Sequence, residues 1–439
     1  MANIRWADAV DGLFGDAAGW LGDLVPNQFS NVFLVAAGPA FTVLAESGLL
    51  NQSDVVINSL QTSTNATLRI VGGEQVINDV LGITTNFTDT AGTGLGANLG
   101  KIIIQNSLTK NLLGTLTGAS AIFNVNGVFD NVGNIEIAAE NALLPVVGKA
   151  QAVFNVEKVL KLTGGGTMLL TSSLDNVIKG TTAASILYNV NNKIIGAGLL
   201  GDGNLTLVNE VAGLIDGSSR QVALIVDTGA KMITNNGVIE DTGLGGTVVK
   251  SSLLNNGTLL ASLGKLAVDG PVSGTGIGKI TKGGSLSFLS SFTQNVSFLA
   301  GGGTLALADP QAYLGKISGF SSLGSTALDL TNFSFGPQVS TIFKGTSLGG
   351  VLTVLDGGQS ANFKLIGDYL NTAFTAVTDG AGGTKILGGG LLPTTATPTA
   401  LITAMASFGA PAAGASSGAA SVHPGPTPAM LVAPHVVAA

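Results

Sequence analysis

Residues capable of acid–base or nucleophilic chemistry are few in this sequence of 439 amino acids. It contains no cysteine, and its two histidines, His423 and His435, both stand close to the C-terminal end. We therefore expect no thiolate or imidazole chemistry, and no zinc site, before residue 388. Carboxylates are the remaining candidates. Because glycosidases use a pair of Asp or Glu side chains, a polysaccharide hydrolase or lyase is the enzyme class that the residue types still allow.

The acidic residues of the central region mostly stand beside glycine or at the ends of apolar runs. They are Asp202, Glu210, Asp216, Asp227, Glu240, Asp241 and Asp269. Asp at such positions usually serves turn formation. Glu240 and Asp241 are the only adjacent acids in this group, and neighbouring side chains on a strand face opposite ways. We predict solvated turn residues, no catalytic site and no enzymatic activity.

Three glycine runs, at 164–166, 301–303 and 388–390, resemble phosphate-binding loops only in composition. None of them ends in the Gly-Lys-Ser/Thr that such loops require, so turns of a repeating fold explain them better. The net charge of −7 argues against a nucleic-acid partner, which basic patches would bind. We expect neither a nucleotide cofactor nor bound nucleic acid.

A recurring phrase between Gly203 and Leu260 indicates the secondary-structure elements that position the acidic residues and glycines described above. Its copies read NEVAGLI at 209–215, NNGVI at 235–239 and NNGTL at 255–259, at intervals of about 20 residues. Short apolar runs separated by Asn, Gly and Asp predict strands and turns with no room for a crossover helix. Asparagines at recurring turns also stack into internal amide ladders, and the candidates are Asn209, Asn236 and Asn256.

Composition supports the same architecture. Hydrophobic residues make up 45% of the chain and charged residues 10%, and there are 64 glycines. Small apolar side chains suit the interior of narrow coils, and glycine suits their corners. The sequence predicts an all-β fold, a right-handed parallel β-solenoid over residues 51–387. Coils of about 20 residues would give about 16 coils and a length of roughly 80 Å.

The two ends of the chain differ from this body. Residues 1–50 hold the only tryptophans, Trp6 and Trp20, and we predict a capping module there; an aromatic platform for sugar binding is the alternative. The apolar stretch 32–50 is broken by Gly38 and Pro39, so we expect no membrane span. Residues 388–439 are rich in Ala, Pro, Ser and Thr, which predicts a flexible tail, with an export signal as one option.

Several segments together resemble a module of large secreted and surface proteins of proteobacteria. The segments are GTGIGKITKGGSLSF at 274–288, NVSFLAGGGTLALADP at 295–310 and GKISGF at 315–320. The NNG phrases are similar to those of autotransporter passengers and haemagglutinin-like β-helices. The resemblance implies an extracellular repeat protein, exported by a type I route from an uncleaved C-terminal segment. The calcium-binding nonapeptide of such proteins is absent. GDGN at 201–204 comes nearest to it, so weakly bound calcium is the one ion that we keep as an alternative to having no cofactor.

Three functions follow as expectations, in order of preference. The first is a structural protein at the bacterial cell surface that associates with itself into a fibre, a layer or a biofilm matrix, because low charge leaves little to keep apolar faces apart. An adhesin that binds glycans or host surfaces is the second, with cell-surface polysaccharide as its partner. The third is a lyase or hydrolase, which requires carboxylates that converge on one face.

Overall fold

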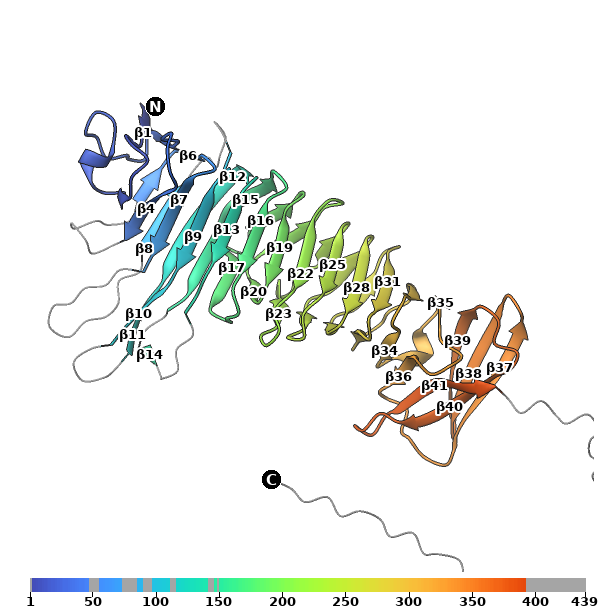
Figure 1. The fold of residues 1–439 in the computed structure, drawn as a ribbon. Coiled ribbons are helices and arrows are strands. Elements are labelled where there is room, and N and C mark those ends of the chain that lie inside the picture. The colour runs from blue at the N-terminus through green and yellow to red at the C-terminus, as the bar shows by residue number, and fades with distance from the viewer. Residues whose placement is uncertain are drawn as a thin grey trace, which may run out of the picture. The chain divides into compact units, whose positions relative to one another are not determined.

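A computed structural model describes residues 2–46, 55–72, 85–89, 97–110, 116–140, 146–147 and 150–391. These residues form strands and two short 3-10 turns, η1 (Ala17–Gly19) and η2 (Pro310–Ala312). Most strands lie parallel in long ladders, which confirms the predicted all-β solenoid (Figure 1). The predicted tail beyond Leu391 lies outside the described residues, and the direction of winding stays a prediction.

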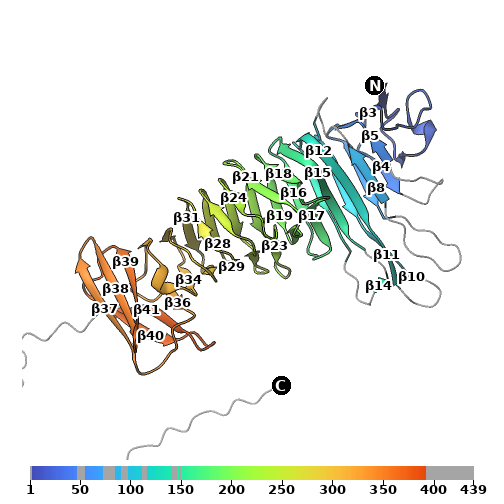
Figure 2. The same ribbon diagram turned by 180° about the vertical axis from the view of Figure 1, so that it is seen from behind.

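Three ladders of parallel strands run along the coils, and Figure 2 shows them from behind. The first ladder contains β2 (Gly12–Leu13), β4 (Phe41–Glu46), β7 (Ala66–Val71), β9 (Lys101–Gln105), β13 (Asn134–Ile137), β16 (Thr167–Leu170), β19 (Lys193–Gly196), β22 (Leu214–Gly217), β25 (Val238–Asp241), β28 (Thr258–Ser262), β31 (Ile277–Thr281), β33 (Asn295–Phe298) and β35 (Lys316–Ser318).

The second ladder contains β5 (Val55–Ile57), β8 (Thr85–Asp89), β12 (Ala121–Asp130), β15 (Ala152–Thr163), β17 (Asn176–Gly180), β20 (Gly198–Gly201), β23 (Leu224–Val226), β26 (Thr247–Val249), β29 (Lys265–Val268), β32 (Ser285–Phe288), β34 (Gly303–Leu307) and β36 (Thr326–Leu330). The third ladder continues from the C-terminal half of β15 through β18 (Ile186–Asn189), β21 (Thr206–Asn209), β24 (Ile233–Asn235), β27 (Leu253–Asn255) and β30 (Val272–Ser273).

Alternation of buried and outward side chains explains why these short runs become strands. In the first ladder Ile215 pairs with Ile239, and Ile239 pairs with Leu259, and all three are fully buried. Their neighbours along each strand face outward, the period of two that a half-buried strand requires. Each coil therefore buries its apolar side chains against the coils next to it, at about 25 cal/mol per Å² of apolar surface.

Strand pairing crosses the predicted boundary at residue 50. Strand β4 pairs along its full length with β7, so the N-terminal module shares the first ladder with the body. A further parallel sheet of β1 (Ala2–Arg5), β3 (Ser30–Leu34) and β6 (Ser59–Thr62) also crosses this boundary. Three short strands, β10 (Ser107–Lys110), β11 (Leu116–Ala119) and β14 (Val146–Val147), form a separate small sheet.

The C-terminal part of the predicted solenoid folds differently. Strands β37 (Val339–Thr346), β38 (Gly349–Asp356) and β39 (Gln359–Ile366) are antiparallel to one another, and so are β40 (Thr372–Thr378) and β41 (Thr384–Leu391). Within the described residues the first ladder has 13 strands up to β35, so about 16 coils is an overestimate. The last described strand, β41, ends at Leu391 and belongs to these antiparallel strands.

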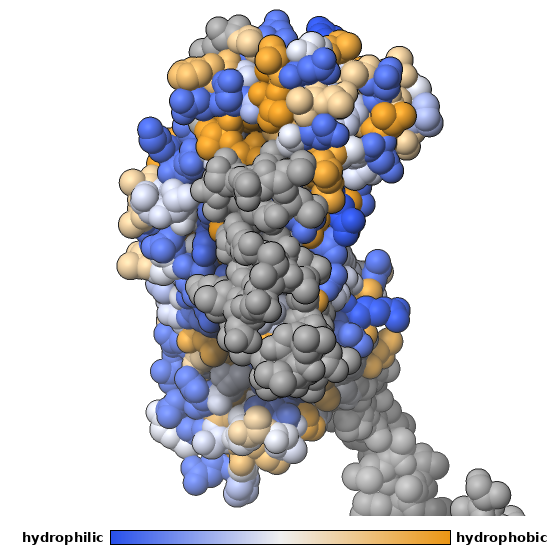
Figure 3. All heavy atoms as spheres, turned by 90° about the vertical axis from the view of Figure 1, so that its left-hand side faces the viewer, coloured by the Kyte–Doolittle hydropathy of each residue, from blue (hydrophilic) through white to orange (hydrophobic). Residues whose placement is uncertain are grey.

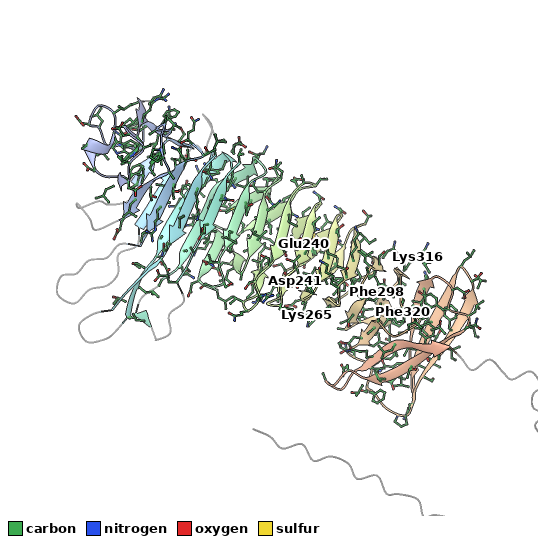
Figure 4. The ribbon with its side chains drawn as sticks, viewed as in Figure 1. Glu240, Asp241, Lys265, Phe298, Lys316 and Phe320 are labelled. Carbon is green, nitrogen blue, oxygen red and sulfur yellow. The ribbon has the colours of Figure 1, made fainter. Side chains whose placement is uncertain are left out.

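An aromatic cluster lies where the coils meet the antiparallel strands. Phe298 and Phe320, which are labelled in Figure 4, pack edge to face with ring centroids 5.7 Å apart. Phe320 in turn stacks on Phe374 of β40 at 6.1 Å. Tyr369 donates a hydrogen bond to the Phe320 carbonyl at 2.8 Å. These contacts join the two parts through large aromatic rings, of which Phe298, Phe320 and Tyr369 are buried and Phe374 is partly buried.

Candidate functional site

A row of buried side-chain amides links successive coils where the third-ladder strands end; we call it the amide ladder. In the central coils Asn189 Nδ2 donates to Asn209 Oδ1 at 2.9 Å, and Asn209 donates to Asn235 at 2.9 Å. Asn235 then donates to Asn255 at 2.7 Å, and Asn255 donates to Gln294 Oε1 at 2.7 Å. The three asparagine steps span 20, 26 and 20 residues, so each step is one coil.

The amide ladder extends toward the N-terminal coils. Thr62 Oγ1 donates to Asn98 Oδ1 at 2.6 Å, Asn98 donates to Asn131 at 2.7 Å, and Asn131 donates to Asn192 at 2.8 Å. The backbone N–H of Asn192 donates to Asn189 Oδ1 at 3.1 Å, which joins the two halves. All five side chains are fully buried. Because each of these side chains has a hydrogen-bond partner in the row, the amide ladder places polar groups in the interior at no cost of unpaired amides.

Glycines make room for this amide ladder where a coil contributes no asparagine. Asn131 reaches Asn192 across the coil that contains Gly166, and a Cβ at Gly166 would lie 2.9 Å from Asn131 Nδ2. In the same way Asn255 reaches Gln294 across the coil of Gly276, where a Cβ would collide with Asn255 Nδ2. Gly166 therefore serves packing of the interior, whereas Gly164 and Gly165, with φ angles of 97° and 75°, serve the turn.

Two of the predicted ladder residues lie elsewhere. Asn209 belongs to the amide ladder, but the prediction for Asn236 and Asn256 is wrong, because Asn235 and Asn255 occupy those steps. Asn235 and Asn255 are the last inward-facing residues of their strands, so the next residue faces outward. Asn256 Nδ2 donates to Asn236 Oδ1 at 3.2 Å, and Asn236 donates to Glu210 at 3.3 Å. This outer row is shorter and partly exposed to solvent.

Two carboxylates, Asp216 and Glu240, lie side by side on the outer side of the first ladder. They pair in register on β22 and β25. Thr242 donates its hydroxyl and its backbone N–H to Asp216 at 2.8–3.0 Å. Burial raises the pKa of Asp216, an effect that the Thr242 hydrogen bonds oppose. Burial and then the charge of Asp216 raise the pKa of Glu240.

Asp241 differs from both because its side chain faces the interior and is fully buried. Thr247 donates a hydrogen bond to Asp241 Oδ1 at 3.1 Å, whereas Oδ2 has no partner. Burial, followed by the charges of Asp216 and Glu240, raises the pKa of Asp241 to about 7, although the Thr247 hydrogen bond lowers it. Figure 4 labels Glu240 and Asp241 in the central coils. The expectation of solvated acids is thus wrong for Asp216 and Asp241.

The other central acids have the turn roles that their neighbours predict. Asp202 has a left-handed backbone with a φ of 45°, and its carboxylate lies 3.9 Å from Lys179 Nζ. Asp227 accepts a hydrogen bond from the backbone N–H of Gly229 at 2.9 Å. Asp269 is exposed in the turn after β29. These acids do not converge with Asp216 and Glu240 on one face.

The tryptophans are buried and form a pair. Trp6 is 3% exposed and Trp20 is 1% exposed, and their rings meet edge to face with centroids 4.8 Å apart. Each indole N–H donates to a nearby carbonyl, Trp6 to Val10 at 3.1 Å and Trp20 to Phe14 at 2.9 Å. A ring whose faces are buried has no free surface on which a sugar can stack. The platform interpretation is therefore wrong, and the cap stays a prediction.

Comparison with protein-family models, with curated proteins and with solved structures finds no match for this chain. Both histidines lie outside the described residues. Among the described side chains, no group of three or more His, Cys, Asp or Glu is placed to hold a metal ion. No helix in the described part of the chain is long and apolar enough to cross a lipid bilayer.

Proposed function

We propose that this protein is an extracellular structural protein that associates end to end with further copies of itself into a fibre or matrix at a bacterial surface. The observation that carries the proposal is a 16-stranded sheet with an open strand edge at each end, β2 at one and β37 at the other. Joining unlike ends of identical chains repeats from copy to copy, and it yields filaments when the rotation between copies does not close a ring. The low charge of the chain favours such association.

Exposed apolar side chains at the N-terminal end supply one of the two surfaces. Val10, Leu21, Leu24 and Phe29 are between 58% and 65% exposed. Apolar residues gather on the upper part of this end in Figure 3, which views the stack from its N-terminal side. Residues of this size exposed together are typical of an interaction surface.

Strand β37 supplies the other surface. Among the described strands it pairs with β38 alone, so its second edge presents unpaired backbone groups. Ile342 on this strand is 45% exposed, and Leu348 in the following turn is 82% exposed. An unpaired edge with apolar side chains is a template for a strand of another chain. A second copy offers such a strand at its own N-terminal end.

Sedimentation velocity and negative-stain electron microscopy of the purified full chain test the proposal. The expected result is filaments whose amount rises with protein concentration. Phe29→Asp and Ile342→Lys, one at each end, should each shift the protein toward monomers. Val211→Asp is the matched control, because Val211 is 80% exposed on a central coil. Monomers at high concentration, or equal loss of filaments in the control, would refute end-to-end association.

A polysaccharide hydrolase or lyase is not supported by the carboxylates. Asp216 is only 7% exposed, and both of its oxygens accept hydrogen bonds from Thr242. A nearly buried Asp216 does not fit the pair of accessible carboxylates that such a mechanism requires.

A further inference from the structure

A polar groove of about 580 Å³ lies along the last coils, next to the antiparallel strands. It follows the C-terminal ends of β32, β34 and β36, which are in register, since Phe288 pairs with Leu307 and Leu307 with Leu330. The turns after these strands consequently stack on one another. Its polar lining residues are Ser290, Ser291, Asp309, Gln311, Asn332 and Gln359.

Three of these residues form a row. Ser290, Asp309 and Asn332 each stand second after the end of a paired strand, so the turns that carry them follow one another at the coil spacing of about 4.8 Å. That spacing is comparable to one unit of a sugar chain. Asn332 Nδ2 donates to the Ala308 carbonyl of the neighbouring turn, which leaves its Oδ1 to accept from a ligand. Gln311 lies in η2, directly after the turn of Asp309, and Gln359 is the first residue of β39. Gln311 Nε2 donates to Gln359 Oε1 at 3.3 Å.

From this lining we infer that the groove binds a neutral oligosaccharide. Hydroxyl and amide groups both donate and accept hydrogen bonds, and a carboxylate accepts them, which matches the hydroxyls of a sugar. None of the described lining residues is Lys or Arg, so an anionic sugar or a phosphate would lack a counter-charge. The volume falls within the ~300–1,000 Å³ typical of ligand sites.

The groove is held by rigid packing behind it. The rings of Phe288 and Phe292 stack with centroids 3.6 Å apart and planes inclined by 7°, which fixes the turn that carries Ser290 and Ser291. Phe333 is 1% exposed and anchors the turn of Asn332. The carboxylate of Asp309 does not cap the η2 turn and so stays available to a ligand. A site fixed before binding loses less conformational freedom when ligand binds.

Isothermal titration of the full chain with uncharged hexasaccharides (cellohexaose, maltohexaose and laminarihexaose) tests the inference, with hexagalacturonate as the acidic probe. At least one neutral probe should bind with a Kd of about 1 mM or tighter. Asp309→Asn and Gln359→Ala, on different elements, should each weaken that binding about tenfold or more. Asp269→Asn is the matched control, since Asp269 is an exposed acid in the turn of the preceding coil and does not line the groove.

Thermal melting of each variant separates loss of binding from loss of folding. Binding of a neutral probe that neither groove variant weakens would overturn the assignment, and so would preference for hexagalacturonate or the absence of binding to all neutral probes. Because the groove contains none of the residues altered to test self-association, its result is independent of the proposed assembly.

Discussion

At the scale of single residues, the amide ladder shows how polar side chains specify the stacking of coils. Asn235 Oδ1 accepts from Asn209, and its Nδ2 donates to Asn255 and to the Thr258 carbonyl. A coil displaced by one residue would leave these groups buried without partners. The penalty for an unpaired buried polar group exceeds the net gain from a satisfied one, so the amide ladder contributes chiefly to register.

Replacing one ladder amide should therefore cost more than replacing its neighbour. Asn235→Leu leaves the buried Asn255 Oδ1 without its donor, at about 1–3 kcal/mol. Asn209 Nδ2 keeps its hydrogen bonds to the Gly213 and Val238 carbonyls. Asn236→Leu alters the outer row, where water can replace the lost contacts, and should change stability by less than about 0.5 kcal/mol. Guanidinium unfolding monitored by circular dichroism compares the two. Equal destabilisation would contradict the role assigned to the amide ladder.

Asp241 should make stability depend on pH. Its pKa is raised from the ordinary 3.8 to about 7 in the folded chain, so between these values the folded state binds more protons than the unfolded state. Stability should fall as pH rises from about 4 to about 7. Asp241→Asn should flatten this slope and stabilise the protein at pH 8 by a few kcal/mol, about 1.4 kcal/mol per unit of pKa shift. Thermal melting of the wild type and of Asp241→Asn over pH 4–8 measures this dependence, with Asp269→Asn as the control. If the slope of stability against pH were the same in Asp241→Asn as in the wild type, the raised pKa of Asp241 would be contradicted.

At the scale of elements, the turn glycines differ in whether the fold requires them, and two matched substitutions show the difference. Gly276→Ala would place a methyl group against Asn255 Nδ2 and the Gly257 carbonyl, whereas a Cβ at Gly358 meets no atom within 4 Å. Neither glycine has a positive φ, so strain in the backbone does not differ. We expect Gly276→Ala to destabilise by about 1–3 kcal/mol. Gly358→Ala should be neutral or stabilising by up to about 1 kcal/mol. Chemical unfolding of both variants measures the two changes in stability. An unchanged stability of Gly276→Ala would show that the interior rearranges to accommodate the added methyl group, and would contradict the expectation.

The sequence predicts the solenoid because the phrase of asparagine, glycine and apolar residues repeats at a regular interval. The antiparallel C-terminal strands are not predicted, because no such repeat marks them. Clean alternation in VLTVLD predicts a half-exposed strand, but alternation is the same in parallel and antiparallel pairs. The informative feature is the turn. Asp356 pairs with Gln359 across Gly357 and Gly358, and Gly357 has a φ of 57°, as expected for a two-residue hairpin loop. The groove could not be predicted, because its residues are brought together from separate coils.

At the scale of the whole molecule, stability and association have a common origin. Each coil satisfies its backbone and buries its apolar side chains only against its neighbours, so only the outermost strands lack one. At the C-terminal end the last coil pairs with β39 and β41, and among the described strands of the 16-stranded sheet the one with a single partner there is β37. The N-terminal end retains exposed Leu24 and Phe29, and the antiparallel strands leave the edge of β37 open. A further copy at either end would supply the missing neighbour. The same stacking that folds the chain therefore favours its assembly.

Net charge should control this assembly. The chain carries −7 at pH 7, and like charges on successive copies repel one another. Lowering the pH from 8 toward 5 protonates the carboxylates whose pKa is raised, which reduces the repulsion; at pH 8, raising the salt from about 10 mM to about 0.5 M should act in the same direction by screening. Light scattering at fixed protein concentration should therefore rise along both paths. Phe29→Asp adds charge and removes an apolar contact, so it should respond to neither. If the wild-type filaments dissociated in acid or in high salt, ionic contacts between copies would hold them together, and association through apolar ends would be excluded.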